Sequence, residues 1–144
     1  AENAQARLAG AIRAFEENPN VDIVASETAN WKIDEAYTLS QRLFSEHPDV
    51  GAVFAANDMM ALGIIEYLSE TGRDTVLVAA FDALNQSQQA LRDGTLDVTI
   101  DQQAARQGYL GVEYAVRALN GEDLPDETLI DVLVVTAETI EMSE

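Results

Sequence analysis

Polar side chains directly follow several short apolar runs in this sequence, where they could act together on one ligand. The pairs at these positions are Ser26-Glu27, Asn57-Asp58, Phe81-Asp82 and Asp101-Gln102. An ionised aspartate accepts hydrogen bonds from two hydroxyl groups, while asparagine and glutamine both donate and accept. A flat aromatic ring covers the apolar C–H face of a sugar, whose edges carry the hydroxyl groups. These residue types therefore favour the binding of a sugar or polyol.

The sequence lacks the motifs of the common enzyme classes. It contains no GxGxxG, no GxxxxGK[ST] and no GxSxG, which argues against a dinucleotide, a P-loop nucleotide and a serine nucleophile. The only histidine, His47, precedes a proline and is interpreted as a turn residue. Asp93, Asp97 and Asp101 lack the dense spacing of a calcium loop and are interpreted as solvated charge. We therefore expect no catalytic residue, no metal and no cofactor.

The charge balance narrows the range of partners. The chain has 26 acidic and 8 basic residues, a formal net charge of −18, and no cysteine. Such a surface repels phosphate backbones and anionic lipids, so we expect no nucleic-acid partner. No apolar run reaches the length of about 18 to 20 residues that a membrane span requires, so we expect no membrane insertion. The first residues, Ala1-Glu2-Asn3, also lack the basic and apolar segments of a secretory signal.

Hydrophobic spacing alternates between helical and extended periods along the whole chain. The predicted helices cover 2–17, 35–46, 58–70, 86–91 and 103–120. The predicted strands cover 21–26, 51–56, 75–80, 96–101 and 129–135. Apolar strands that alternate with helices form parallel sheets covered on both faces, so we predict a three-layer, flavodoxin-like α/β fold. Ligands of such sheets bind beyond the carboxyl ends of the strands, where the polar pairs lie.

Aspartate side chains are expected to begin two of the helices. Asp34 precedes the predicted helix 35–46, and Asp58 is the first residue of the predicted helix 58–70. A carboxylate there can accept hydrogen bonds from the first backbone N–H groups. We therefore interpret Asp58 as a helix cap and keep Asn57, one residue earlier, as the ligand candidate.

The sequence opens with a helix, whereas alternating α/β sheets usually begin with a central strand. We therefore expect residues 1–144 to be one truncated lobe of a longer, two-lobed protein. No internal repeat or flexible linker interrupts the pattern.

From Asn3 to about Val135 the chain resembles the carboxyl-terminal lobe of type I periplasmic sugar-binding proteins, the ribose-binding-protein group. The order AND at one strand end, FD at the next and TIxQ at a third carries the resemblance. The matching segments are NAQARLAG (3–10), HPDVGAVFAANDMMALG (47–63), VLVAAFDA (76–83), ALRDGTLDVTIDQ (90–102) and GYLGVEYAVRALNGE (108–122).

The resemblance implies a ligand-binding role for six residues. They are Arg7 as a hydroxyl donor, Trp31 as a stacking aromatic, Asn57 and Asp82 as hydroxyl partners, Phe81 as pocket wall and Gln102 as a partner near the hinge. Each has a structural alternative: an ion pair for Arg7, core packing for Trp31 and Phe81, helix caps for Asn57 and Asp82, and an exposed loop amide for Gln102. Trp31 stands where the ribose binders usually carry a smaller aromatic, which argues against ribose as the ligand.

The resemblance also implies how the chain is divided and what it works with. Residues 1–102 and 129–144 would form the core of one lobe, and residues 103–128 would pack on the other lobe. Such proteins deliver a sugar to an ABC transporter permease, which implies a periplasmic location. Because 1–144 lacks the other lobe, we hypothesise that isolated chains bury these surfaces against each other as a homodimer.

Two alternative functions remain open at this point. The first is the effector-sensing core of a LacI-type transcriptional regulator, which shares the fold. Those cores usually carry Pro-x-Leu-Thr-Thr where this chain has GTLDVTID. The second is an enzyme on a flavodoxin-like sheet, which requires a nucleophile or cofactor loop that the sequence does not show.

Overall fold

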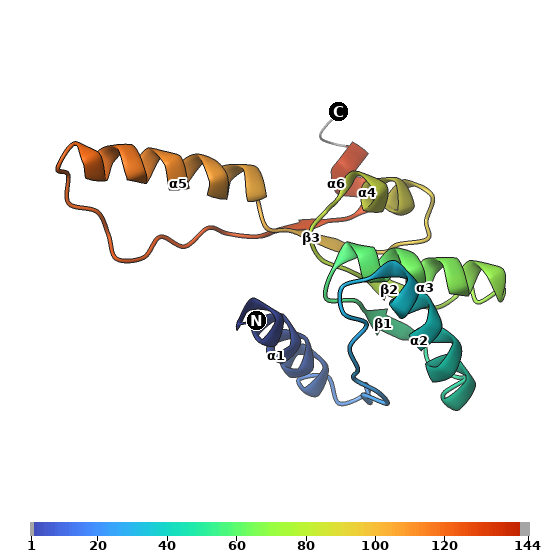
Figure 1. The fold of residues 1–144 in the computed structure, drawn as a ribbon. Helices are drawn as coiled ribbons and strands as arrows, with labels where there is room; N and C mark the ends of the chain where they lie inside the picture. The colour runs from blue at the N-terminus through green and yellow to red at the C-terminus, as the bar shows by residue number, and fades with distance from the viewer. Residues whose placement is uncertain (1, 142–144) are drawn as a thin grey trace.

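The structure is a computed structural model that describes residues 2–141 of the 144-residue chain. Helices and strands alternate through most of it, as predicted (Figure 1). The helices are α1 (Glu2–Glu16), α2 (Ile33–Glu46), α3 (Asp58–Glu70), α4 (Asn85–Arg92), α5 (Ala104–Leu119) and α6 (Ala137–Glu141). The strands are β1 (Ala52–Phe54), β2 (Leu77–Ala79), β3 (Thr99–Asp101) and β4 (Leu133–Val135).

The strands form two two-stranded sheets, which one isolated bridge joins. β1 and β2 are parallel, with Ala52 opposite Leu77. A parallel bridge between Ala79 and Val98 continues the order from β2 to the start of β3. β4 pairs with β3 in the antiparallel sense, with Thr99 opposite Val135. β1, β2 and β3 therefore run parallel as predicted, whereas the last predicted strand is shorter than 129–135 and runs antiparallel to β3.

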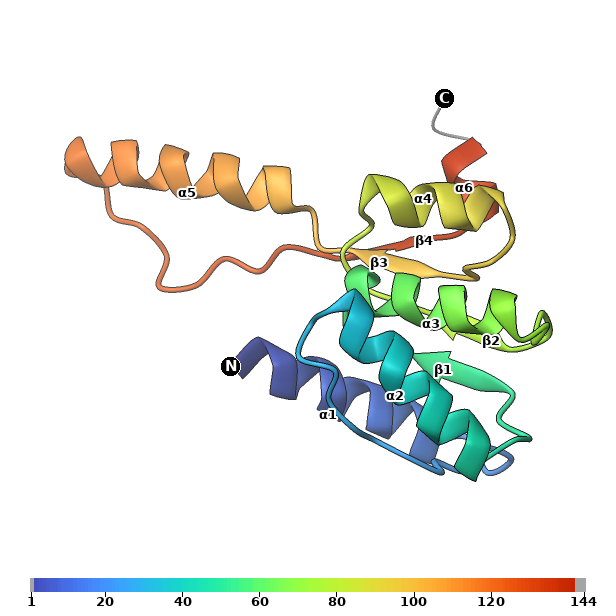
Figure 2. The same ribbon diagram turned by 45° about the vertical axis from the view of Figure 1, so that its right-hand side comes forward.

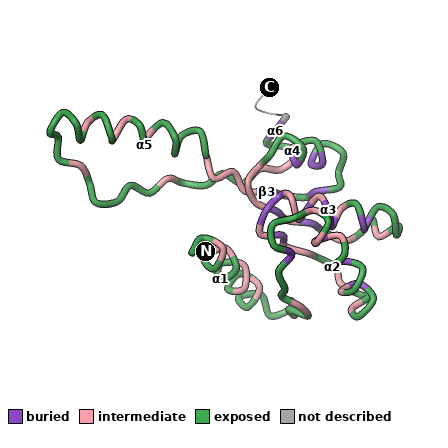
Figure 3. The backbone as a smooth tube through the Cα atoms, in the orientation of Figure 1, coloured by how far each residue is buried: buried purple, intermediate pink, exposed green. Residues whose placement is uncertain are grey.

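The core lies between the sheet and the helices packed on it. In both views α4 and α6 appear above β3, and α3 appears below it (Figures 1 and 2). The core joins side chains from α2, α3, β2 and the segments around α4, among them Phe44, Ile64, Leu68, Val78 and Leu91. Burial is concentrated there (Figure 3). This core holds the carboxyl ends of β1, β2 and β3 in fixed relative positions.

The predicted strand at 21–26 does not form. The segment has no strand or helix assignment, and Val21, Ile23 and Val24 are exposed. An apolar run becomes a strand only when a neighbouring strand satisfies its backbone N–H and C=O groups. Within the described residues β1 pairs only with β2, so the segment lacks that neighbour. The strand prediction for 21–26 is therefore wrong for this chain.

The start of α2 also differs from expectation. The helix begins at Ile33 with Lys32 as its N-cap residue, and no side chain caps it. Asp34 lies in the first turn instead, where its negative charge is favourable near the positive end of the helix dipole. The short helix α6 at the end of the described chain was not predicted.

α5 projects away from the rest of the molecule (Figures 1 and 2). No residue of this helix is buried. Tyr109, Val112, Val116 and Leu119 are exposed and recur at helical spacing, so they form one apolar stripe. Among the described residues, no helix is both long enough and apolar enough to cross a membrane.

Candidate functional site

The carboxyl ends of three strands meet at one edge of the sheet. The backbone N–H of Asp58, after β1, donates to the carbonyl of Phe81, after β2, at 2.8 Å. The N–H of Asp82 donates in turn to the carbonyl of Ile100 in β3, also at 2.8 Å. Asn57, Phe81, Asp82 and Gln102 therefore lie on adjacent loops at this edge, as the strand-end argument predicts.

Arg7 reaches this edge from α1. Its Nη1 donates to the carbonyl oxygen of Ala56 at 2.8 Å, and its Nη2 donates to Oδ1 of Asp82 at 3.3 Å. A longer contact of 3.5 Å joins Nη2 to Oε1 of Gln102. The guanidinium thus spans all three strand ends, and its side chain is only 12% exposed. Arg7 is not the surface ion pair of the structural alternative, because its partner Asp82 is also largely covered.

Two aromatic rings flank the guanidinium of Arg7. Its Cζ lies 3.8 Å from the ring centroid of Phe81 and 5.8 Å from that of Trp31. Both distances fall within the range of attraction between a cation and an aromatic ring. Trp31 remains 42% exposed, so it is not a core residue and keeps surface for another contact.

Asp82 is the acceptor at the centre of the cluster. Its Oδ1 accepts from Nε2 of Gln102 at 2.9 Å as well as from Arg7. Both bonds end on Oδ1, and Oδ2 is the second acceptor of this carboxylate. Burial is the main cause that raises the pKa of Asp82 above its ordinary value, and the nearby charge of Asp58 raises it further. The Arg7 guanidinium opposes both effects.

The helix cap expected at Asp58 is provided by Asn57 instead. Asn57 is the N-cap residue of α3, and its Oδ1 accepts from the backbone N–H of Met60 at 2.9 Å. Asp58 does not cap the helix; it accepts from the hydroxyl of Thr99 and from the backbone N–H of Leu84, each at 2.7 Å. Asn57 is 7% exposed, and its amide NH2 group is the part that a ligand could contact.

Backbone strain is concentrated at the same place. Within residues 2–141, the non-glycine residues with positive φ are Asn30, Trp31, Asp82, Ala83 and Gln103. Each is one of the six candidate residues or the chain neighbour of one. Such conformations are costly for residues with a Cβ and persist where the surrounding structure imposes them, often at functional sites. This signal is independent of residue type and supports a site around Trp31, Asp82 and Gln102.

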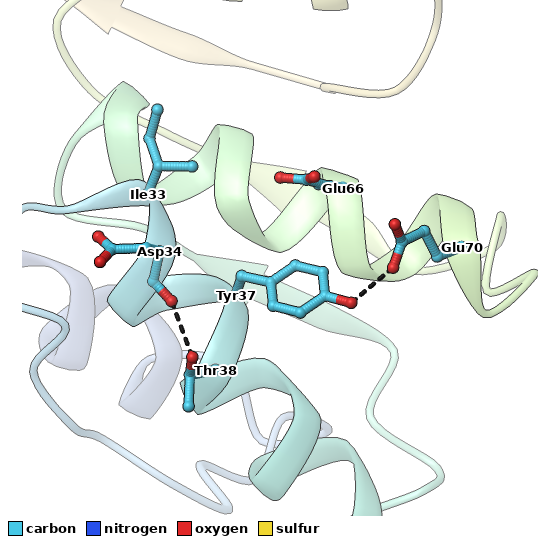
Figure 4. A pocket seen from close by; sticks show the side chains of 6 residues that line it. All are labelled: Ile33, Asp34, Tyr37, Thr38, Glu66 and Glu70. Atoms are coloured by element: carbon cyan, nitrogen blue, oxygen red, sulfur yellow. Dashed lines mark hydrogen bonds between the residues drawn. The ribbon is translucent and has the colours of Figure 1, made fainter.

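The described cavities lie elsewhere. A cavity of about 460 Å³ between α2 and α3 is lined by Tyr37, by the carboxylates of Asp34, Glu66 and Glu70, and by two further residues of α2 (Figure 4). The Tyr37 hydroxyl donates to Glu70 there at 2.5 Å. A second cavity of about 580 Å³ runs along α5. Neither of these two cavities includes a candidate residue.

The cluster has the chemistry of recognition. It brings together one cation, one carboxylate, two carboxamides and two aromatic rings, which can donate to and accept from hydroxyl groups. No group of three or more His, Cys, Asp or Glu side chains within the described part of the chain could hold a metal ion.

Two contributors to the site were not predicted from the sequence. The contact of the Ala56 carbonyl with Arg7 could not be predicted, because a backbone acceptor is present in every residue type. The contacts of Asp58 with Thr99 and Leu84 were missed because Asp58 was interpreted as the helix cap, a role that Asn and Asp fill equally well.

Known proteins resemble the chain over most of its length. A family model described as a periplasmic binding protein domain matches residues 1–123. The ribose import binding protein RbsB of Salmonella typhimurium is 37% identical over 114 residues, which are 79% of this chain and 38% of that protein. The D-apiose import binding protein of Paraburkholderia graminis is 32% identical over 136 residues, 93% of this chain and 44% of that protein. The chain thus spans less than half the length of these curated relatives.

Solved structures share the fold. An ABC transporter periplasmic solute-binding protein from Actinobacillus succinogenes with bound D-allose has a TM-score of 0.90 at 31% identity, covering 92% of this chain and 48% of that one. One from Bacillus halodurans with bound myo-inositol has a TM-score of 0.87 at 36% identity, covering 94% and 47%. These matches confirm the predicted α/β fold of one binding-protein lobe, and the relatives are named as binding proteins rather than enzymes. On the family match and the shared fold, the chain belongs to the periplasmic binding protein domain family.

Proposed function

We propose that this chain is one lobe of a non-catalytic solute-binding protein that delivers a small neutral sugar or polyol to an ABC transporter. The observation that carries the proposal is the cluster in which Arg7 contacts Asp82 and Gln102 between the rings of Trp31 and Phe81. The names of the relatives, which include ribose, apiose and allose binders, support the ligand class.

The cluster fits a ligand rich in hydroxyl groups. Oδ2 of Asp82 accepts from a ligand hydroxyl, while the amides of Asn57 and Gln102 donate or accept as the hydroxyl requires. The exposed face of Trp31 covers the C–H surface of the ring. The charges of Arg7 and Asp82 cancel, so a charged ligand would leave one of them without its counter-charge. The site therefore selects a neutral ligand.

A second lobe completes the site in this proposal. The apolar stripe on α5 is exposed here, and the chain covers 48% of the solved relative with a TM-score of 0.90. An apolar stripe of this kind on a projecting helix requires a covering surface. In this proposal residues 103–128 would pack on the second lobe, and residues 2–102 and 129–141 would form the core of this one. Closure of two lobes over the ligand would also enclose the cluster around Arg7.

The transport role implies a permease partner and a periplasmic location. The matched relatives are named as import binding proteins and as ABC transporter solute-binding proteins. These names favour transport over the LacI-type regulator that the sequence left open. With a net charge of −18, the surface is also unsuited to a nucleic-acid partner.

Isothermal titration calorimetry tests the proposal. The full-length protein, meaning the natural gene product that contains these residues, is titrated with D-ribose, D-allose, D-apiose, myo-inositol and the charged sugar D-glucuronate. At least one neutral compound is expected to bind, and glucuronate is not. Asp82→Asn is expected to abolish binding without lowering the melting temperature, because burial, the main cause that raises the pKa of Asp82, disfavours its ionised form.

The matched control is Asp93→Asn, a C-cap aspartate of α4 outside the cluster, and it is expected to bind as the wild type does. Absence of binding to every neutral sugar and polyol, or equal binding by Asp82→Asn, would contradict the proposal.

A further inference from the structure

A fully buried carboxylate lies directly beneath the candidate site. Asp58 and Thr99 are both 0% exposed. The Thr99 hydroxyl donates to Oδ1 of Asp58 at 2.7 Å, and the backbone N–H of Leu84 donates to Oδ2 at 2.7 Å. Asp58 is also the first residue of α3, where the helix dipole favours a negative charge. The burial of an ionisable group is costly without such partners, so its position calls for an explanation.

The partners of Asp58 and Thr99 belong to the turn that presents Asp82. The backbone N–H of Ala83 donates to the Thr99 hydroxyl at 3.3 Å, and that of Leu84 donates to Asp58. The two side chains thus hold consecutive amides of one turn. Just before them, the N–H of Asp58 donates to the carbonyl of Phe81. The turn is therefore held from α3 and from β3 at once.

This turn has an unfavourable backbone conformation. Asp82 has φ +119° and Ala83 has φ +56°, values that residues with a Cβ rarely adopt. No glycine is present to relieve either position. Without external hydrogen bonds such a turn would relax toward negative φ, and the Asp82 carboxylate would move away from Arg7 and Gln102.

We propose that Asp58 and Thr99 are a pair of positioning residues, which hold the Phe81–Leu84 turn in the strained form that presents Asp82 to the ligand. The inference rests on the proposed function for the identity of the ligand, but the turn geometry can be measured without any ligand. Neither residue touches the sugar in this scheme; both act through the backbone of the turn. The pair would also explain why Asn57, rather than Asp58, caps α3.

Substitutions of Thr99 test the pair in the full-length protein. Thr99→Val removes the hydroxyl while keeping the shape of the side chain, and Thr99→Ser keeps the hydroxyl. The matched control is Thr71→Val at the other end of α3, where the lost hydroxyl donates to the Tyr67 carbonyl. We expect Thr99→Val to weaken sugar binding about tenfold, the equivalent of one buried hydrogen bond to a charged group. Thr99→Ser and Thr71→Val are expected to bind as the wild type does.

A second measurement separates positioning from general stability. Amide hydrogen exchange of Ala83 and Leu84, without sugar, is expected to become faster in Thr99→Val but not in Thr71→Val. Asp58→Asn removes a negative charge near the Asp82 carboxylate and is therefore expected to lower the pKa of Asp82. Carbon NMR of the Asp82 carboxyl group over a range of pH measures this change. The charged groups that influence Asp82 are Arg7 from α1 and Asp58 from α3.

The outcomes distinguish the two proposals. If the wild type binds no neutral sugar, the proposed function fails, while the amide exchange of Ala83 and Leu84 still decides the positioning role. If Thr99→Val keeps both wild-type affinity and wild-type exchange at these amides, the positioning role is overturned. A loss of melting temperature of equal size in Thr99→Val and Thr71→Val, with no selective change at the turn, overturns it as well.

Discussion

Arg7 and Asp82 are 75 residues apart in the sequence, and their side chains meet at 3.3 Å above the strand ends. The pair joins the first helix of the chain to the loop after β2. Because both side chains are largely covered, the contact is a fixed part of the site. The pair places one positive and one negative charge together in the site, and Oδ1 of Asp82 accepts hydrogen bonds from both Arg7 and Gln102.

Replacement of Arg7 by lysine is expected to weaken sugar binding by more than tenfold, although the charge is kept. Lysine is a point charge, whereas the arginine fork contacts Ala56 and Asp82 together and stacks on Phe81. Calorimetry with the best-bound sugar measures the loss. The matched control is Arg13→Lys on the same helix, where the side chain is exposed and pairs only with Glu17. Equal affinities for Arg7→Lys and Arg13→Lys would contradict the assignment.

Sugar affinity is expected to fall as the pH drops through the raised pKa of Asp82, because protonation removes the charge that Arg7 and a ligand hydroxyl engage. Stability is expected to respond in the opposite sense. The folded chain holds this proton more tightly than the unfolded chain, so the contribution of Asp82 to the free energy of unfolding decreases as the pH rises from the ordinary carboxyl pKa to the raised one.

Calorimetric titrations and thermal melts in the same buffers, from neutral to acidic pH, measure both effects. Asp82→Asn gives the background melting curve for groups other than Asp82. An affinity that stays constant across this interval would show that the carboxylate takes no part in binding.

Gly63→Ala is expected to destabilise the fold by about 1–3 kcal/mol, the usual cost of overpacking a core. A Cβ at Gly63 in α3 would lie 2.2 Å from the carbonyl oxygen of Ile33, a backbone atom at the start of α2 that cannot rotate away. The same substitution displaces the segment that carries Trp31, so affinity is expected to fall too.

Thermal and denaturant unfolding measure the stability change. Gly10→Ala in α1 is the control, because its added Cβ meets nothing within 4 Å. It is expected to stabilise the helix by about 0.5–1 kcal/mol. A Gly63→Ala variant as stable as the wild type would show that α2 can move away from α3 at little cost.

The isolated 144-residue chain is expected to self-associate through the apolar stripe of α5. Tyr109 and Val112 are both 69% exposed and Leu119 is 87% exposed, so association would remove a large apolar area from water. The net charge of −18 opposes this contact, and added salt is expected to strengthen it by screening. Sedimentation velocity over a range of concentrations measures the association.

Val112→Glu is expected to prevent association, whereas Ser45→Glu, which adds the same charge on an exposed face of α2, is not. A monomer at every concentration and salt level would contradict the prediction.

The sequence by itself determined the order of helices and strands from α2 to β4, and the edge at which the polar residues gather. Apolar spacing predicted α1 and α5 to within one residue of their observed ends. It also placed Asn57, Asp82 and Gln102 at the ends of successive strands. Local periodicity suffices here, because each element follows from which face of a short segment is apolar. Arg7 was predicted as a ligand residue only from the family resemblance. The residues next to a helical arginine do not indicate which distant side chain it contacts.

Other features were decided only by the tertiary structure. The segment 21–26 has the pattern of a strand, but a strand forms only with a neighbour, and none is present among the described residues. Asn57 and Asp58 are equally good caps by residue type. Asp58 instead accepts hydrogen bonds from Thr99 and Leu84, which are 41 and 26 residues away in the sequence. Those long-range contacts, together with the positive φ of Asp82, give the site its shape. No local pattern encodes them, because they depend on groups that only the folded chain brings together.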